Sequence, residues 1–389
     1  MRVRTITIAL GFVAIFGALW VMWPAPVSPA YWDEPEPPAM TGPLAPDAAL
    51  REAALYPAGP AGTAEGIATG EDGTVYFGTP DGRIQRLAAG APDGAPMLED
   101  VAQITDTRIL GLDWVRPGVL GIAAVSGLYT LDLDTGHHRL VSTGVPAHSY
   151  GYINDLAAAP DGTIYFTDSS TRWGHSANNP GYIYDLLENR PSGAIYAWDP
   201  ELHQSRLVRD RLYYPNGMEL ASDGRSLFIA ESFRYRILRL WIDGPNAGNI
   251  DILADNLPGL PDGIDSDGQG RLFVAMSTRR IPLMRTLHRN PPLARLIAKL
   301  PGWMRPSGGP AQGFVLVMDE ATGAPLDTLH DPDGRLCLLS NVDITAGGSI
   351  WLGSTDCGVI GRLALPDLPA PSGQQPDTGP SAPLLSEHR

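Results

Sequence analysis

The sequence predicts an all-β protein, a six-bladed β-propeller, from a repeated hairpin unit, its turn residues and its composition. Four segments share one order of residues: a polar leading residue, usually a small residue, an apolar residue, and then a Gly-containing turn followed by an apolar strand. A hairpin unit repeated at a spacing of roughly 40 to 60 residues is typical of a propeller. The four leading residues are Glu65, Asn154, Asn216 and Asp262.

The turns and strands of these units support the hairpin assignment. Asp-Gly pairs such as Asp72-Gly73 suit tight hairpins, because Gly accepts positive φ and Asp tolerates it. The strands after the turns read VYFG, IYFT, LFIA and LFVA, which are rich in residues that favour strands. Two weaker copies, led by Leu110 and Asn341, bring the predicted blades to six.

The composition fits one large β domain and excludes a nucleic-acid-binding protein. The 389 residues include 44 Gly and 37 Pro, so the chain is rich in turns, and 43% hydrophobic residues suffice for a large core. The formal net charge of −15 leaves no overall basic surface for nucleic acid. We assign residues 45–366 to the propeller and residues 367–389, which lack a periodic pattern, to a disordered tail.

The N-terminal residues predict a transmembrane helix that anchors an exported propeller. An uncharged run over residues 5–23 holds about nineteen residues, which at about 1.5 Å each span roughly one hydrocarbon core. Basic residues before the run and acidic residues after it favour a cytoplasmic N-terminus. A cleaved signal peptide is the alternative, but the run is long for one and ends in Trp-Val-Met-Trp. We therefore predict an anchor over residues 1–24 and an extended, proline-rich spacer over residues 25–44.

The leading residues predict a metal site at one end of the central channel. The innermost strands of a propeller line this channel, so residues at the same place in successive repeats converge. One Glu, two Asn and one Asp offer only oxygen ligands and two negative charges, which suits Ca²⁺ better than Zn²⁺. Alternatively, these side chains only bond backbone groups at the channel mouth.

Two segments resemble a known family of proteins. Residues 214–244 (YPNGMELASDGRSLFIAESFRYRILRLWIDG) and 257–276 (LPGLPDGIDSDGQGRLFVAM) are similar to strictosidine-synthase-like proteins. These resemble the senescence-marker, gluconolactonase and paraoxonase proteins, which are six-bladed propellers. In the metal-dependent members, a Glu, two Asn and an Asp hold Ca²⁺, and Asp155 matches a residue that lies beside the metal. The resemblance thus implies four calcium ligands: Glu65, Asn154, Asn216 and Asp262.

Two departures from the family pattern bear on the implied activity. Paraoxonases have a His base at the leading position of the second blade, where this chain has Leu110. Plant synthases use a catalytic Glu in the last blade and lack the full set of ligands, whereas this chain has Asn341 near that position. The resemblance therefore favours a membrane-anchored, calcium-dependent hydrolase of esters or lactones. An amine–aldehyde condensing enzyme, or a non-enzymatic exported propeller that binds a partner through its top face, are the alternatives.

Three residues are candidates for proton transfer. Asp155 directly follows a predicted metal ligand and carries a carboxylate, so it is the first candidate for the base that activates water. His148 lies on the loop that enters the same blade, and His175 lies in an insertion over residues 171–192. Each of these two histidines is alternatively a solvated loop residue. The aromatic residues of the insertion suggest a lid or a wall of the substrate site.

A second insertion, residues 277–312, contains a basic stretch over residues 279–305 that no acidic residue interrupts. Such a stretch favours an anionic membrane surface or a partner groove if it forms an amphipathic helix. Alternatively, it packs as a helical cap on the top face of the propeller. Four of its apolar residues have the spacing of one helical face: Leu293, Leu296, Ile297 and Leu300.

The two cysteines, Cys337 and Cys357, are both predicted in the sixth blade. Export would expose them to oxidising conditions. Adjacent strands of one blade can bring two Cα atoms within the distance that a disulfide requires. A disulfide between them is therefore an expectation.

Overall fold

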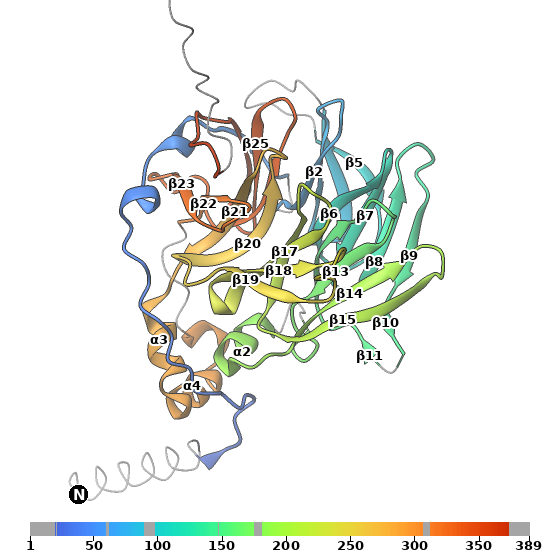
Figure 1. Ribbon diagram of the computed structural model, residues 1–389. Helices are drawn as coiled ribbons and strands as arrows, with labels where there is room; N and C mark the ends of the chain where they lie inside the picture. The colour runs from blue at the N-terminus through green and yellow to red at the C-terminus, as the bar shows by residue number, and fades with distance from the viewer. Residues whose placement is uncertain are drawn as a thin grey trace, which may run out of the picture.

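The predicted six-bladed β-propeller is confirmed. The computed structural model describes residues 20, 22–59, 62–88, 98–146, 148–174, 181–305 and 312–372. These form six four-stranded antiparallel sheets, and the innermost strand of each sheet contacts the innermost strand of the next, which closes the ring (Figure 1).

The first three blades follow one another along the chain, each listed from its innermost strand outward. Blade 1 consists of β2 (Glu65–Thr69), β3 (Val75–Gly78), β4 (Arg83–Leu87) and β5 (Leu98–Gln103). Blade 2 consists of β6 (Ile109–Arg116), β7 (Val119–Ala124), β8 (Gly127–Asp132) and β9 (His138–Ser142). Blade 3 consists of β12 (Ile153–Ala158), β13 (Ile164–Asp168), β14 (Gly193–Asp199) and β15 (Gln204–Leu212).

The last three blades have the same order of strands, except that the outermost strand of blade 6 comes from the start of the chain. Blade 4 consists of β16 (Pro215–Leu220), β17 (Ser226–Glu231), β18 (Arg236–Trp241) and β19 (Ile250–Ala254). Blade 5 consists of β20 (Gly259–Ser266), β21 (Arg271–Arg279), β22 (Phe314–Asp319) and β23 (Pro325–His330). Blade 6 consists of β24 (Leu339–Ile344), β25 (Ser349–Ser354), β26 (Val359–Ala364) and β1 (Ala54–Pro57).

The pairing of β1 with β26 joins the two ends of the propeller within one sheet. The two strands are antiparallel, with Leu55 opposite Gly361. The short helices η1 (Gly42–Leu44) and η2 (Ala49–Glu52) precede β1. The chain thus forms a helical turn and then the outermost strand of the last blade, not of the first.

The hydrophobic core lies between neighbouring blades. Every residue of β7 and of β22 is buried, because the middle strands of a blade are covered on both faces. One cluster joins Phe228 and Tyr235 of blade 4 to Leu272 and Val274 of blade 5. Outer strands such as β15 are mostly exposed. The apolar runs after the turns therefore pack blade against blade.

The two predicted insertions form a helical cap at the end of the channel where the innermost strands begin. Helix α2 (Gly181–Glu188) follows β13, and helices α3 (Pro282–His288) and α4 (Pro291–Ala298) with η4 (Gly302–Met304) follow β21. They lie together at the bottom of Figure 1 and contact one another.

The expected apolar face of the second insertion is wrong in detail. Helix α4 ends at Ala298, before Leu300, and its buried residues are Ala294 and Ala298. Leu293 is exposed. Small residues face the neighbouring helices because α4 packs closely against α2 and α3.

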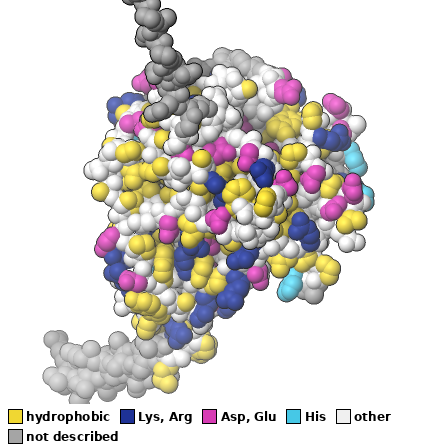
Figure 2. Space-filling view, viewed as in Figure 1, with side chains coloured by type: hydrophobic (Ala, Val, Ile, Leu, Met, Phe, Trp, Pro, Cys, Tyr) yellow, Lys and Arg dark blue, Asp and Glu magenta, His cyan; other side chains and the backbone are white. Residues whose placement is uncertain are grey.

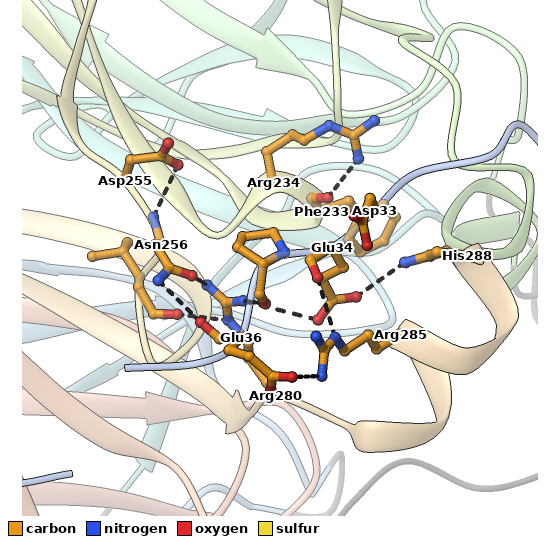
Figure 3. A network of polar contacts seen from close by, with 12 residues as sticks. Asp33, Glu34, Glu36, Phe233, Arg234, Asp255, Asn256, Arg280, Arg285 and His288 are labelled. Atoms are coloured by element: carbon orange, nitrogen blue, oxygen red, sulfur yellow. Dashed lines mark hydrogen bonds and ion pairs between the residues drawn. The ribbon is translucent and has the colours of Figure 1, made fainter. Parts of the chain in front are cut away.

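The N-terminal segment that precedes the first blade packs on the cap, and we call residues 27–36 the strap (Figure 3). The ring centroids of Trp32 and Tyr235 are 6.0 Å apart, and the backbone N–H of Trp32 donates to the carbonyl of His288 at 3.1 Å. Glu34 is 1% exposed, and its Oε2 lies 3.2 Å from Nδ1 of His288. The proline-rich stretch is irregular, as its composition predicts, and it is docked against the propeller.

Three basic residues of the cap bind this strap. Arg280 donates to a strap carbonyl at 3.0 Å, Arg289 donates to Asp33 at 2.7 Å, and Arg285 forms an ion pair with Glu36. Lys and Arg side chains gather over the cap in Figure 2. A part of the basic character of the insertion is therefore neutralised by the chain's own acidic residues.

In the described part of the chain, no helix has both the length and the apolar composition to span a bilayer. The predicted anchor, residues 5–23, lies almost wholly outside the described residues and stays a prediction. The expected disulfide is present: Cys337 and Cys357 are bonded, with their Cα atoms 5.8 Å apart.

Candidate metal and substrate site

All six innermost strands are irregular at the leading residue. In each blade the register shifts there, so that two residues of the innermost strand face one residue of the second strand. In blade 4, for example, Asn216 and Gly217 face Ala230. Bulges of this kind re-aim a side chain and are common beside functional sites. The facing residues are all small: Gly78, Ala123, Thr167, Ala230, Ala275 and Gly353.

The register corrects the leading residue of blade 6. The shift in β24 lies between Leu339 and Asn341, so Ser340 has the leading position and Asn341 the position after it. A Cβ atom added to Gly263 would lie 2.7 Å from the carbonyl oxygen of Ser340, which is the contact that the other blades show. The expectation of Asn341 at this position was one residue too far, because spacing alone does not reveal where a bulge starts.

Glycine after the leading residue lets neighbouring innermost strands approach. A Cβ atom at Gly217 would lie 2.2 Å from the carbonyl oxygen of Asp262 in the next blade. Gly66 has a φ of +60°, and a Cβ atom there would lie 2.8 Å from the backbone of Gly111. Only blades 3 and 6 carry a side chain at this position, and in blade 3 it is Asp155.

The structure joins two of the four predicted ligands by a hydrogen bond and brings a third within electrostatic range of them. Asn216 hydrogen-bonds to Asp262, and Glu65 lies close enough to raise the pKa of Asp262 further after burial has raised it. Asn154 has the same position in the strand between β6 and β16. Its Nδ2 donates to Ser169 Oγ at 2.8 Å, which leaves the amide oxygen as the ligand atom. The four side chains thus start from equivalent positions at one end of the channel, which we call the mouth.

An arginine that the sequence analysis did not single out also belongs to the mouth. Nε of Arg108 lies 2.8 Å from Oε2 of Glu65, and Thr355 hydrogen-bonds to the same carboxylate. Burial raises the pKa of Glu65, whereas the charge of Arg108 lowers it. Arg108 stands two residues before the leading position of blade 2, a place that carried no signal in the sequence pattern.

Aromatic residues form the wall above the leading residues. Tyr152, Tyr214 and Phe233 belong to one buried cluster with Leu110, and the rings of Tyr214 and Phe233 stack at 4.2 Å. Burial raises the pKa of Tyr152, and the charges of Glu65 and Arg108 act on it as well, so the phenol lies near both. Two of the rings were detectable in the sequence, since Tyr152 and Tyr214 each stand two positions before a leading Asn.

Asp155 lies between blades 3 and 4 rather than on an open surface. Its Oδ2 accepts a hydrogen bond from the backbone N–H of Met218 at 2.9 Å, and its own N–H donates to Thr167 Oγ1 at 3.0 Å. Burial raises the pKa of Asp155 to about 8. Its charge also contributes to raising the pKa of Asp262.

Two further carboxylates hold the loops that enter the innermost strands. Asp168 accepts hydrogen bonds from the backbone N–H groups of Gly151 and Tyr152 at 2.9 and 2.8 Å. Glu231 accepts one from Tyr213 at 2.7 Å. In blades 3 and 4, a carboxylate that accepts backbone hydrogen bonds therefore fixes the path of the chain just before the leading residue.

The two candidate histidines do not join this group in the described structure. His148 is exposed in a hairpin of β10 (Gly144–Val145) and β11 (His148–Ser149), and β10 contacts β15, the outermost strand of its blade. His175 lies outside the described residues.

Four more carboxylates line the channel further from the mouth. Each stands three positions after a leading residue, and desolvation raises the pKa of every one, to about 6 for Asp113 and Asp343. A pocket of about 500 Å³ between blades 6 and 1 opens at this opposite end and includes Asp343 and Trp351 in its lining. The four residues are Asp113, Glu219, Asp265 and Asp343.

The residues at the mouth fit a hard cation. One buried oxygen at a leading position, Oγ of Ser340, has no hydrogen-bond partner among the described residues. Buried oxygens without a partner are costly unless a ligand completes them. No three His, Cys, Asp or Glu side chains in the described ranges are placed to share a metal. A site here would instead combine two carboxylates with amide oxygens, which suits Ca²⁺.

Comparisons with known proteins agree with this fold. A model of the SMP-30/gluconolactonase/LRE-like region matches residues 110–284, and a model of the strictosidine synthase-like N-terminal region matches residues 42–87. A gluconolactonase from Xanthomonas campestris superposes with a TM-score of 0.56 at 21% identity, over 89% of this chain and 99% of that chain. A calcium-binding protein, regucalcin, from Agrobacterium tumefaciens superposes with a TM-score of 0.53 at 14% identity, over 79% and 93%.

Sequence similarity is higher to one group of relatives. The adipocyte plasma membrane-associated protein of Salmo salar is 31% identical over 370 residues, which are 90% of this chain and 88% of that protein. The chain belongs to the strictosidine-synthase-like family that includes the adipocyte plasma membrane-associated proteins.

Proposed function

We propose that this protein is a membrane-anchored, calcium-dependent hydrolase of esters or lactones. The observation that carries the proposal is the mouth itself, where bulges at equivalent positions gather two carboxylates and two amides beneath an aromatic wall. The names of two structural neighbours, a gluconolactonase and a calcium-binding protein, support this direction.

The proposed ligands are the four leading residues Glu65, Asn154, Asn216 and Asp262. Ca²⁺ bound there would polarise an ester or lactone carbonyl and stabilise the charge that develops on its oxygen. The hydrogen bond from Asn216 to Asp262 and that from Asn154 to Ser169 orient the ligand side chains before a metal binds.

The other residues of the mouth have distinct proposed roles. Tyr152, Tyr214 and Phe233 present an apolar wall that excludes water from the carbonyl and binds the apolar part of a substrate. Asp155 is the proposed proton acceptor, because it follows a ligand directly and its charge acts on the pKa of Asp262. The exposed His148 is not assigned a role in this scheme.

We propose that the mouth faces the membrane. The relatives are named plasma membrane-associated, and the predicted anchor precedes the strap, which is docked on the cap. Since the strap already binds three cap arginines, we place the lipid contact of residues 279–305 on exposed apolar side chains. Trp303 is 84% exposed and Met304 is 48% exposed. Trp side chains favour the interface between water and lipid.

The test is a panel of lactones, aryl esters and phosphotriesters, incubated with the full chain in detergent with and without Ca²⁺. Turnover should disappear on chelation and return when Ca²⁺ is restored. Asp155→Asn should reduce kcat by roughly 100-fold or more if it is the base. Activity that survives chelation would contradict the proposal. Metal-independent condensation of an amine with an aldehyde would support the synthase alternative, and no turnover at all would favour the partner-binding propeller.

A further inference from the structure

We propose that Arg108 is a built-in counter-ion of the mouth that competes with the metal for Glu65. The proposal rests on the proposed function, because it concerns the same site. It assigns Arg108 a role in metal affinity: the guanidinium occupies the carboxylate when the metal is absent and is displaced when the metal binds.

The first step is the nature of the contact between the two side chains. Arg108 Nε and Glu65 Oε2 are 2.8 Å apart, and the two side chains are 20% and 8% exposed. The charge of Arg108 favours the ionised form of Glu65, and the two side chains also share a hydrogen bond. The contact is therefore a close ion pair, and a cation that binds Glu65 has to displace the guanidinium.

The second step is the charge at the mouth. Glu65 and Asp262 carry two negative charges when both are ionised, and Arg108 pairs with one of them, Glu65. A divalent cation bound to Glu65 would lie close to the positive charge of Arg108, and the two would repel each other. A charge within about 4 to 6 Å of an ionisable group changes the pKa of that group by about 1 to 3 units. The corresponding change in affinity for a cation is about 10- to 1,000-fold.

The third step is the room for displacement. Arg108 stands in the loop that enters β6, and its backbone is held by the hydrogen bond from the N–H of Val125 at 3.0 Å. The side chain can therefore swing while the loop keeps its place. Tyr152 and Tyr182 are within electrostatic range of the guanidinium, whose charge lowers the pKa of both phenols against the effect of burial. Aromatic faces accept a displaced guanidinium well.

A purely structural ion pair is the competing explanation. Arg108 and Glu65 belong to neighbouring blades, so their attraction also fastens blade 2 to blade 1. In that case, the loss of Arg108 would loosen Glu65 and weaken metal binding. The two explanations therefore predict opposite signs for the change in affinity.

The experiment is calorimetric titration of CaCl₂ into the metal-stripped full chain, for the wild type, Arg108→Gln and Arg83→Gln. Arg83 is the matched control, because it pairs with Asp81 and Asp100 on the exposed edge of blade 1, the blade of Glu65. Arg108→Gln should bind Ca²⁺ at least about tenfold more tightly than the wild type. Arg83→Gln should bind as the wild type does, since exposed charges are screened.

Thermal unfolding gives a second readout that needs no activity. Metal-free Arg108→Gln should melt below the wild type, and Ca²⁺ should raise its Tm by more than it raises that of the wild type. If Arg108→Gln does not fold, Arg108→Lys serves instead, because its shorter side chain weakens the contact while keeping the charge, and a smaller gain in affinity is expected.

Two outcomes overturn the proposal and differ from each other. Ca²⁺ binding by the wild type together with equal or weaker binding by Arg108→Gln refutes the competition and leaves the calcium site in place. Absence of Ca²⁺ binding in the wild type and in Arg108→Gln refutes the competition together with the metal assignment.

Discussion

Substitution of Glu34 should loosen the strap and destabilise the whole protein. Its carboxylate is the buried acid at the centre of the contacts in Figure 3, with His288 Nδ1 at 3.2 Å and Arg280 Nη1 at 3.9 Å. Tyr235 lies beside it, and burial together with the charge of Glu34 raises the pKa of that phenol. Glu34→Ala removes the one carboxylate that faces these three groups.

The magnitude follows from what remains buried. Breaking a buried pair by removing one partner costs about 3–5 kcal/mol, because the other charge stays uncompensated. Arg280 keeps hydrogen bonds to the carbonyl of Leu257 at 2.7 Å and to Asn256 Oδ1 at 2.5 Å. We therefore expect the lower end of that range, a loss of about 3 kcal/mol in the free energy of unfolding. Glu34→Gln retains the volume and one hydrogen bond and should lose about half as much.

Urea denaturation at pH 7 measures this difference, and Glu36→Ala is the matched control. Glu36 also pairs with a cap arginine, but its side chain is 74% exposed. An exposed pair contributes at most about 1 kcal/mol, so this variant should stay near the wild type. Limited proteolysis should cut the strap of Glu34→Ala first. A Glu34→Ala variant within about 0.5 kcal/mol of the wild type, or equal to Glu36→Ala, would refute the reasoning.

Three further predictions concern the channel and the disulfide. In calorimetric titrations, Asp262→Ala should cost more Ca²⁺ affinity than Asn216→Ala, since it removes a charged ligand; equal losses would contradict the ligand assignment. Burial raises the pKa of Asp113 from 3.8 to about 6. Between pH 3.8 and about 6 the folded protein therefore holds a proton on Asp113 that the unfolded chain has lost, so the free energy of unfolding falls as the pH rises through this interval. Asp113→Asn should therefore stabilise the protein relative to the wild type at pH 8, by up to about 3 kcal/mol, and much less at pH 4; urea denaturation at both values checks the sign. The double variant Cys337→Ser with Cys357→Ser lacks the disulfide, so its unfolded chain gains conformational freedom and the free energy of unfolding should fall by about 3 kcal/mol. An unchanged midpoint of urea denaturation would show that the disulfide adds no stability.

The sequence by itself determined the repeat and the residues that lead it. An Asp-Gly turn and a run such as LFIA specify a hairpin through contacts that are close in sequence, so each blade could be predicted separately. Once six such hairpins close a ring, equivalent positions must converge, which is why Glu65, Asn216 and Asp262 were found together. The pairing of the two cysteines followed from their place in one blade.

Only the tertiary structure decided which other side chains reach the mouth. The path of a loop depends on distant packing, so spacing did not reveal that Arg108 meets Glu65 or that His148 turns away beside an outermost strand. A bulge adds one residue to a strand, and no residue pattern shows where the bulge starts. The prediction therefore put Asn341 at the leading position of blade 6, where the structure has Ser340. The strap is the largest such case: its prolines predict irregular backbone, but its docking depends on Glu34 meeting residues more than 200 positions away. Local patterns thus define the elements, whereas contacts between segments far apart in sequence define the site.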